Sequence, residues 1–252
     1  SLVEQQPFKL LVLGSSPSGL TTKLHDMSTS ALRYYISSVF TLLVHFNWWS
    51  FPKIFFGKPV LIRIKNGPDY YVSNLMDIWT LKEVVVDRQY EMIHKIPKQG
   101  TIVDIGAAIG DFSIYASKKS KRVIAYECED ERVLLMKKNI VLNKATNIDL
   151  HHTRATSLNR ILGKIKRCDF LKIDCEGGEY RIFRNADKAT MKKIRFISME
   201  AHRFDGRMKK EYSDLIQSLK DNHFEVRTVA NPVHGHICFV FAHKKHVSTL
   251  SS

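Results

Sequence analysis

The sequence predicts an α/β protein built on a doubly wound, mostly parallel, seven-stranded sheet, preceded by an N-terminal helical and hairpin extension. Three observations predict this class. From residue 101 onward, short β-branched apolar segments alternate with segments of helical periodicity. The first of these segments ends in a glycine-containing turn that leads into a helix. The last two β-rich segments follow each other closely, which indicates one antiparallel strand inserted at the sheet edge.

The central feature is the turn Gly-Ala-Ala-Ile-Gly at residues 106–110. Thr101 to Ile105 precede it and predict a short buried strand. Asp111 follows it at the expected N-cap of a helix. Arg122 to Tyr126 predict a second strand, which ends at the acid Glu127. A strand, a small-residue turn, a helix and a second strand ending in an acid form the first half of a nucleotide-binding unit.

The residues of this unit distinguish between two ligands. Glu127 lies 21 positions after Gly106, where a carboxylate can accept both hydroxyls of an adenosine ribose. A dinucleotide requires the pattern G-x-G-x-x-G, but Ala108 replaces its second glycine. Asp104 adds a carboxylate that suits an ammonium and a sulfonium and repels a pyrophosphate. The turn therefore favours S-adenosylmethionine over a dinucleotide.

Three stretches resemble the class I S-adenosylmethionine-dependent methyltransferases and, more narrowly, the FkbM family: VDIGAAIGDFSIYA, AYECEDERVLLMKKNIVLN and SLNRILGKIKRCDFLKIDCEGGEY. The resemblance covers roughly residues 74–243 and implies a Rossmann-like fold, S-adenosylmethionine as cofactor and methyl transfer to a hydroxyl. One departure is Cys128, where the family usually has proline after the ribose acid. The cofactor-binding residues expected from the motif are Asp104, Gly106, Ala107, Gly110, Glu127 and Cys128.

Catalytic candidates follow from the rule that ligands bind at the carboxyl ends of parallel strands. Asp174 opens the turn DCEGGEY after the fourth expected strand, and Glu200 and His202 end the fifth. Asp174 or His202 is a candidate general base that deprotonates an acceptor hydroxyl. Two alternatives remain open: the three side chains hold a divalent cation, or Glu200 and His202 close the pocket structurally. We expect no metal.

Length and composition set the domain organisation. The chain has 252 residues, of which 44% are apolar, enough for a full core. We expect a connector at residues 1–26, with Met27 as a candidate natural start, and an extension at residues 27–98. The methyltransferase domain is expected at residues 99–245 and a tail at residues 246–252.

The N-terminal extension contains two recognisable elements. Between residues 30 and 46, apolar residues recur at helical spacing: Leu32, Ile36, Val39, Leu43 and Phe46. This stripe predicts a core-packing or lid helix, and the alternative is a surface helix that dips into a membrane interface. Residues 60–73 predict a hairpin around Asn66-Gly67. The helical segment from Asp77 to Val86 and Tyr90 beyond it are expected to cover the cofactor or to pack in the core.

Charge and cysteine usage constrain the partners. The net charge is +14, which indicates either an anionic partner or simply a lysine-rich surface. Four cysteines without regular spacing predict a reduced, cytoplasmic protein with small buried thiols. The most apolar stretch, residues 36–49, is interrupted and shorter than the ~20 residues a membrane span needs. No transmembrane span is therefore expected.

The expected acceptor is a small hydroxylated molecule, a sugar or natural product that carries an anionic group. The first alternative is an RNA or DNA methyltransferase, which the basic charge favours. Base N-methylation, however, uses an (Asp/Asn)-Pro-Pro-aromatic turn, and this chain has Asp174-Cys175-Glu176-Gly177 at that place. The second alternative is a non-catalytic scaffold that keeps the fold. The acids at positions 104, 127 and 174 argue against it.

Overall fold

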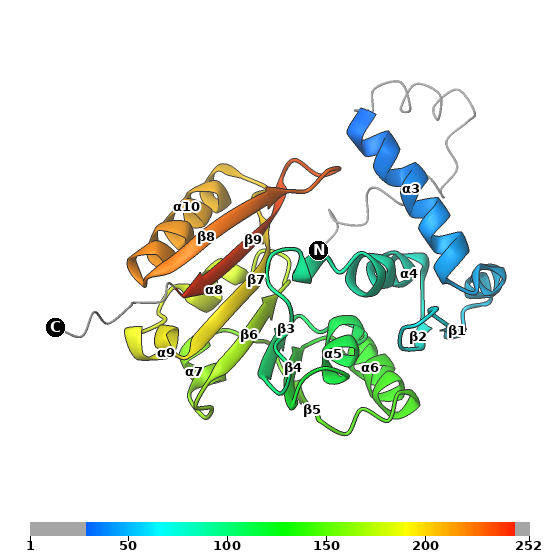
Figure 1. Cartoon of the computed structure of the whole chain (residues 1–252), viewed down its shortest axis with the longest axis horizontal. Coiled ribbons are helices and arrows are strands. Elements are labelled where there is room, and N and C mark those ends of the chain that lie inside the picture. Colours follow the sequence, from blue (N-terminus) through cyan, green and yellow to red (C-terminus); the bar gives the residue numbers. More distant parts are fainter. Residues whose placement is uncertain (1–28, 245–252) are drawn as a thin grey trace.

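The computed structural model describes residues 29–244. The expected connector at residues 1–26, the candidate start at Met27 and the expected tail at residues 246–252 lie outside the described residues. Within residues 29–244 the sheet has seven strands in the order β5-β4-β3-β6-β7-β9-β8 (Figure 1). The strands are β3 (Thr101–Ile105), β4 (Arg122–Glu127), β5 (Ile148–His152), β6 (Cys168–Ile173), β7 (Ile194–His202), β8 (Phe224–Ala230) and β9 (Ile237–Lys244).

The strand order confirms the doubly wound sheet. β3 pairs in parallel with β4 on one side and β6 on the other, so the chain changes direction across the sheet between these strands. β9 pairs antiparallel with both β7 and β8. The predicted antiparallel strand therefore exists, but it lies one position inside the edge, and β8 forms the edge itself.

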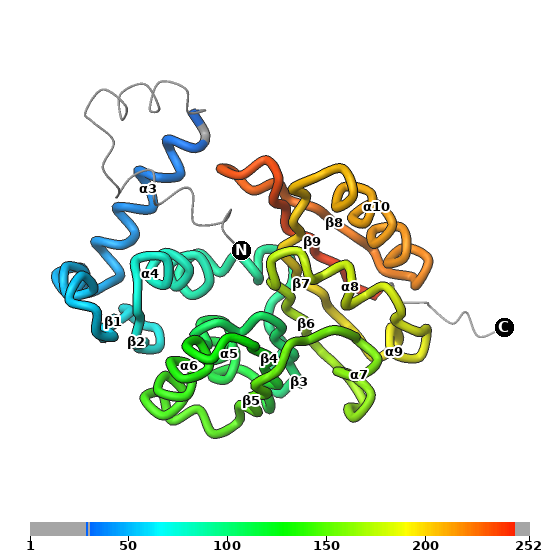
Figure 2. Tube along the Cα trace, turned by 180° about the vertical axis from the view of Figure 1, so that it is seen from behind, coloured from blue at the N-terminus to red at the C-terminus, as the bar shows by residue number. Residues whose placement is uncertain are grey.

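Helices cover both faces of the sheet (Figures 1 and 2). One face packs on a group that follows β5 in the chain: α7 (Leu158–Leu162), α8 (Glu179–Phe183), α9 (Lys188–Lys192) and α10 (Gly206–Asp221). The other face packs on α5 (Asp111–Ser117), on α6 (Asp130–Leu142) and on the segment from α4 to Tyr90. Because both faces are covered, the central strands are apolar almost throughout, as their sequences predict.

The extension contains the predicted hairpin, β1 (Val60–Ile62) paired antiparallel with β2 (Tyr70–Val72). After it, α4 (Leu75–Leu81) begins at Asn74 with a capping box completed by Asp77. The chain continues through a π-helical turn, η2 (Lys82–Val86), and a 3₁₀ turn, η3 (Gln89–Glu91). This confirms the predicted helical segment and leads the backbone to Tyr90, which is buried against β9.

The N-terminal helix differs from its main prediction. The apolar stripe lies on α3 (Thr29–His45), and a 3₁₀ segment, η1 (Trp48–Phe56), follows it. Of the five stripe residues, Phe46 is buried, whereas Leu32, Ile36, Val39 and Leu43 are 38–62% exposed. The stripe residues in α3 therefore do not pack in the core. Core contact is made by the opposite side of α3, where Tyr34 and Tyr35 pack against Trp79 of α4.

Two smaller expectations are also wrong. The N-cap of α5 is Gly110 rather than Asp111, which is the first helical residue. Cys128 is exposed, so it is not a small buried thiol like Cys168 and Cys238. All four cysteines are free in the described chain.

Gly106 is required by a close approach of two strand ends. Its φ is +76°, and a Cβ built on it would lie 1.7 Å from the carbonyl oxygen of Asp174. Gly106→Ala is therefore expected to cost about 2–3 kcal/mol of unfolding free energy, from the left-handed backbone and the clash together. Denaturant unfolding measures this cost. Gly206→Ala is the matched control, because a Cβ there meets nothing within 4 Å, and a loss as large for Gly206→Ala would contradict the argument.

Candidate active site

The predicted residues lie at the carboxyl ends of β3, β4, β6 and β7, which meet at one end of the sheet (Figure 1). Glu127, at the end of β4, is 8% exposed and reaches the glycine-containing turn. One of its oxygens accepts the Ala108 N–H at 2.8 Å. The other accepts the N–H groups of Cys128 and Glu129 at 2.6 and 2.9 Å. Glu127 thus holds the turn against the second strand, on the side where a ribose is expected.

Asp104 lies beneath the same turn and is fully buried. One carboxylate oxygen accepts the Ser113 hydroxyl at 2.6 Å. The other lies 3.2 Å from Nζ of Lys172, an ion-pair contact without hydrogen-bond geometry. Burial raises the pKa of Asp104, and the Lys172 charge opposes that shift. The contacts of Asp104 are therefore internal to the protein, and a direct contact with a cofactor stays a prediction.

Lys172 contacts the turn at residues 106–110 from inside the protein. It lies next to the last residue of β6, is 2% exposed, and donates to the carbonyl oxygen of Gly106 at 2.7 Å. Burial opposes its charge, but the carboxylates of Asp104, Asp174 and Asp111 outweigh burial and raise the pKa of Lys172. Asp111 itself has its pKa raised to about 7, chiefly by burial. Lys172 therefore stays charged and connects the ends of β3 and β6.

Asp174 follows β6 directly and is partly exposed. Its Oδ2 accepts the hydroxyl of Tyr90 at 2.7 Å, and its backbone N–H donates to Ile105 at 3.0 Å. Burial raises the pKa of Tyr90 well above its ordinary value, followed by the Asp174 charge, so Tyr90 keeps its proton and acts as donor. The segment before the first motif thus reaches the catalytic candidate through Tyr90.

His202, at the end of β7, is held by a buried carboxylate. Glu179 is fully buried, and its Oε1 accepts the backbone N–H of His202 at 2.8 Å and lies 3.3 Å from Nδ1. Its other oxygen accepts the Gly177 N–H at 2.8 Å. A carboxylate beside Nδ1 favours a proton on that nitrogen and leaves Nε2 as the basic nitrogen. Nε2 lies 3.6 Å from Oε1 of Glu200.

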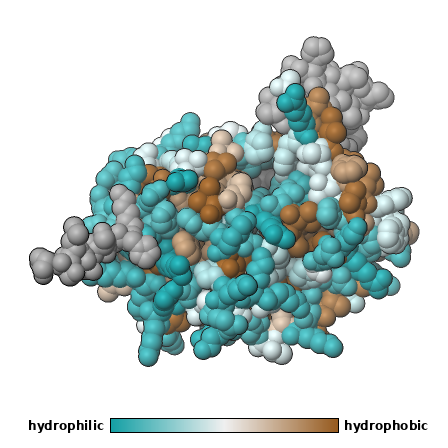
Figure 3. Space-filling view, in the orientation of Figure 1, coloured by the Kyte–Doolittle hydropathy of each residue, from teal (hydrophilic) through white to brown (hydrophobic). Residues whose placement is uncertain are grey.

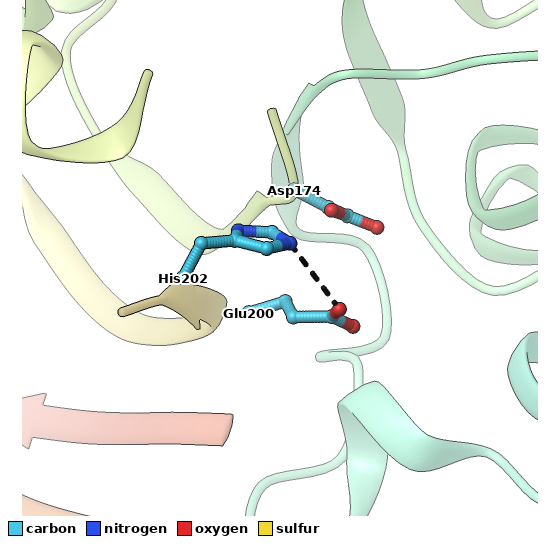
Figure 4. A group of neighbouring side chains, drawn as sticks. All are labelled: Asp174, Glu200 and His202. Carbon is cyan, nitrogen blue, oxygen red and sulfur yellow. Dashed lines mark ion pairs between the residues drawn. The ribbon is translucent and has the colours of Figure 1, made fainter. Parts of the chain in front are cut away.

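Asp174, Glu200 and His202 form one cluster, with one ligand atom of each within 4.8 Å of the others (Figure 4). Burial, followed by the Asp174 charge, raises the pKa of Glu200 well above its ordinary value, and His202 opposes that shift. The three catalytic candidates are therefore brought together from two strand ends. Two carboxylates and an imidazole can share a proton, and the same donor set can hold a divalent cation.

Three residues of the site were not assigned their roles from the sequence. Lys172 could have been found as a basic residue near the end of a mostly apolar strand. Glu179 was recognised as an acid of the turn, but the imidazole that pairs with it lies 23 residues away. Tyr90 was expected to cover the cofactor or pack in the core, and its contact with Asp174 bridges 84 residues. No sequence spacing predicts contacts at such separations.

Comparison with known proteins agrees with this fold. Residues 145–226 match the model of the methyltransferase FkbM domain. A tRNA (guanine(37)-N(1))-methyltransferase from Theileria parva is 27% identical over 169 residues, which are 64% of this chain and 32% of that protein. The chain thus spans about a third of the length of the curated relative it matches.

Two solved structures share the fold. A Streptococcus mutans protein described as a methyltransferase, in complex with SAH, matches with a TM-score of 0.51 and 11% identity over 64% of this chain and 97% of that one. A Clostridium thermocellum protein described as an rRNA methylase matches with a TM-score of 0.51 and 12% identity over 63% and 94% of the two chains. At this identity the likeness concerns the fold alone.

The seven-stranded sheet defines the chain as having the class I, Rossmann-like methyltransferase fold. The FkbM resemblance found in the sequence is confirmed by the family model over residues 145–226. The fold and the match over residues 145–226 are those of S-adenosylmethionine-dependent methyltransferases. Within residues 29–244, no helix is long and apolar enough to cross a membrane.

Proposed function

We propose that the protein transfers the methyl group of S-adenosylmethionine to a hydroxyl of a small molecule. The observation that carries the proposal is the cluster of Asp174, Glu200 and His202 at the carboxyl ends of β6 and β7. Transfer from a sulfonium is an in-line displacement that mainly requires positioning, but a hydroxyl acceptor must also lose its proton. Side chains that can take up this proton therefore support a hydroxyl as the group that accepts the methyl.

The residues present fit the nucleoside end of the cofactor. Glu127 would accept a ribose hydroxyl, because its carboxylate lies at the end of β4 beside the turn and has about four acceptor sites, of which backbone N–H groups use three and leave one. Gly106, Ala107 and Gly110 would let the backbone approach the methionine end, with Asp104 beneath it and Cys128 at the ribose side. The cofactor, when bound, supplies the electrophilic methyl group.

The cluster would act on the acceptor in two ways. His202 would take the hydroxyl proton on Nε2, since Glu179 favours a proton on Nδ1 and stabilises the imidazolium that forms. Asp174, held by Tyr90, would accept the hydrogen bond of the same hydroxyl and orient its oxygen. Glu200 interacts with both Asp174 and His202, and its raised pKa supports a neutral role in which it holds a proton.

Removal of the Glu127 carboxylate tests the proposed cofactor site. Glu127→Ala is expected to weaken S-adenosylmethionine binding by about 10–100-fold, because charge-assisted hydrogen bonds contribute about 1.5–3 kcal/mol. Calorimetric titration measures the affinity, and circular dichroism shows that the fold survives. Glu131→Ala, on the exposed part of α6, is the matched control. Unchanged affinity in Glu127→Ala would remove Glu127 from the cofactor site.

A second candidate function is RNA methylation. It is favoured by the Theileria parva relative, whose name states tRNA as its substrate, and by the net charge of +14. The acids at Asp174 and Glu176 oppose the approach of a polyanion to the cluster. Titration with a short RNA at two salt concentrations separates the candidates. Tight, strongly salt-dependent binding would favour RNA over a small hydroxylated acceptor.

A further inference from the structure

The outer side of α3 and the η1 segment carry exposed apolar residues that the core does not use. On α3 they lie three, four, seven and eight positions apart, which places them on one side of the helix: Leu32, Ile36, Val39, Phe40, Leu43 and Val44. Their side chains are 38–69% exposed. In the space-filling view a hydrophobic strip follows α3 (Figure 3), and both ribbon views show this helix projecting from the domain (Figures 1 and 2).

The η1 segment extends this surface with large aromatic side chains. Trp48 and Trp49 are 48% and 65% exposed, and Phe55 and Phe56 are 71% and 81% exposed. Such an accumulation of exposed aromatic and aliphatic residues is uncommon on a surface that faces only water. We refer to the exposed residues of α3 and η1 together as the apolar surface.

The inner side of α3 is fixed to the domain, so the apolar surface has a defined orientation. The Tyr34 hydroxyl donates to Glu83, which also accepts the Trp79 indole N–H at 2.9 Å. The Lys82 ammonium lies 4.2 Å from the centre of the Tyr34 ring. These contacts hold one side of the helix on α4 and η2 and leave its apolar side outward.

The segment that carries the apolar surface is rich in cations, one of which, Arg63, pairs with Asp69 at 3.9 Å. Between residues 29 and 68 there is no aspartate or glutamate, whereas five basic residues are present: Arg33, Lys53, Lys58, Arg63 and Lys65. Lys53, Lys58 and Arg63 line a groove of about 600 Å³ beside Trp49 and Phe56. Cations, tryptophans and an apolar helix side in one place are typical of a segment that lies in the interface of an anionic bilayer.

We propose that α3 and η1 bind the surface of an anionic phospholipid bilayer. The apolar side of α3 and the η1 aromatics enter the acyl boundary, and the basic residues contact lipid phosphates. With 17 residues and its inner side packed on the domain, α3 lies in the interface and does not cross it. A second copy of the chain fits the apolar surface less well, because the basic residues beside it would approach the same basic residues of the other copy.

Vesicle binding of the full chain tests the proposal. Sedimentation with vesicles of phosphatidylcholine and phosphatidylglycerol is expected to recover the protein, and vesicles of phosphatidylcholine alone are expected to recover much less. Trp48 and Trp49 are two of three tryptophans in the chain, so their emission is expected to shift to shorter wavelength on binding. Recovery in neither vesicle would overturn the proposal.

Two variants assign the binding to its residues. Trp48→Ser/Trp49→Ser is expected to lower the vesicle partition coefficient at least about tenfold, and Lys53→Gln/Lys58→Gln to lower the preference for anionic lipid about tenfold. Leu134→Ser/Val141→Ser is the matched control, because these residues are 61% and 76% exposed on α6, away from α3. Equal losses in the control would overturn the assignment.

Thermal unfolding and S-adenosylmethionine titration of each variant separate a lost surface from a lost fold. Light scattering after size exclusion tests the competing occupant. A dimer that dissociates in Trp48→Ser/Trp49→Ser, with no vesicle binding by the parent chain, would assign the surface to a second copy and overturn the bilayer proposal. Cofactor affinity is expected to be unchanged, so failure of this proposal is distinguishable from failure of the proposed function.

Discussion

Asp174→Asn is expected to lower the rate of methyl transfer by about 10²–10⁴-fold while S-adenosylmethionine binding is preserved. The substitution is isosteric, and the asparagine oxygen can still accept the Tyr90 hydroxyl that now lies 2.7 Å from Asp174. The substitution removes the negative charge that would accept a hydrogen bond from the substrate hydroxyl and stabilise a protonated His202. Single-turnover rates with a bound acceptor measure the chemical step, and calorimetry measures cofactor affinity.

The same turn offers a control for this prediction. Glu176→Gln removes a carboxylate two residues away, on an exposed side chain. Its rate is expected to stay within about twofold of the parent, since exposed substitutions away from the cluster have small effects. A parental rate in Asp174→Asn would exclude Asp174 from the mechanism and leave it a structural role.

A chelator separates proton removal by the cluster from metal activation. The side chains of Asp174, Glu200 and His202 could also hold a divalent cation. If His202 acts as the base, the rate is expected to be unchanged by EDTA and not raised by added Mg²⁺ or Mn²⁺. Full loss of activity in EDTA, restored by a divalent ion, would replace the base with a metal-bound acceptor oxygen.

The sequence predicts the sheet well because its signals are local. The turn at residues 106–110 and the acid at Glu127 lie within one unit of strand, turn, helix and strand, so spacing alone locates them. The cluster of Asp174, Glu200 and His202 was also expected, because strand ends of a parallel sheet meet at one edge. Their catalytic roles stay predictions.

The errors came from features that spacing does not determine. A helical apolar stripe shows that one side of α3 avoids water, but it does not state whether protein or another phase covers that side. The partner of a buried charge is equally invisible, because Lys172 meets Gly106 across 66 residues. Such contacts depend on the order of strands in the sheet, which follows from packing of the whole chain.

Lys172→Met is expected to destabilise the protein by about 3–5 kcal/mol, because it leaves the buried carboxylate of Asp104 without its cation. The same substitution frees the carbonyl oxygen of Gly106, so the turn loses its support from β6. Denaturant unfolding at pH 7 measures the loss. Lys121→Met, on an exposed side chain, is the matched control and is expected to stay within about 0.5 kcal/mol of the parent.

The pH dependence of the stability of Lys172→Met tests whether the unpaired carboxylate of Asp104 causes the loss. Burial already raises the pKa of Asp104, and without Lys172 the hydrogen bond from Ser113 is left to oppose that shift. A raised pKa in the folded state means that stability is fully present below the unfolded pKa of about 3.9 and is lost as pH rises through the folded pKa. The deficit of Lys172→Met relative to the parent is therefore expected to grow from pH 4 to pH 8. Asp104→Asn in the same chain is expected to recover part of the stability and to flatten this pH dependence, whereas a deficit that is equal at both pH values would indicate lost packing rather than an unpaired charge.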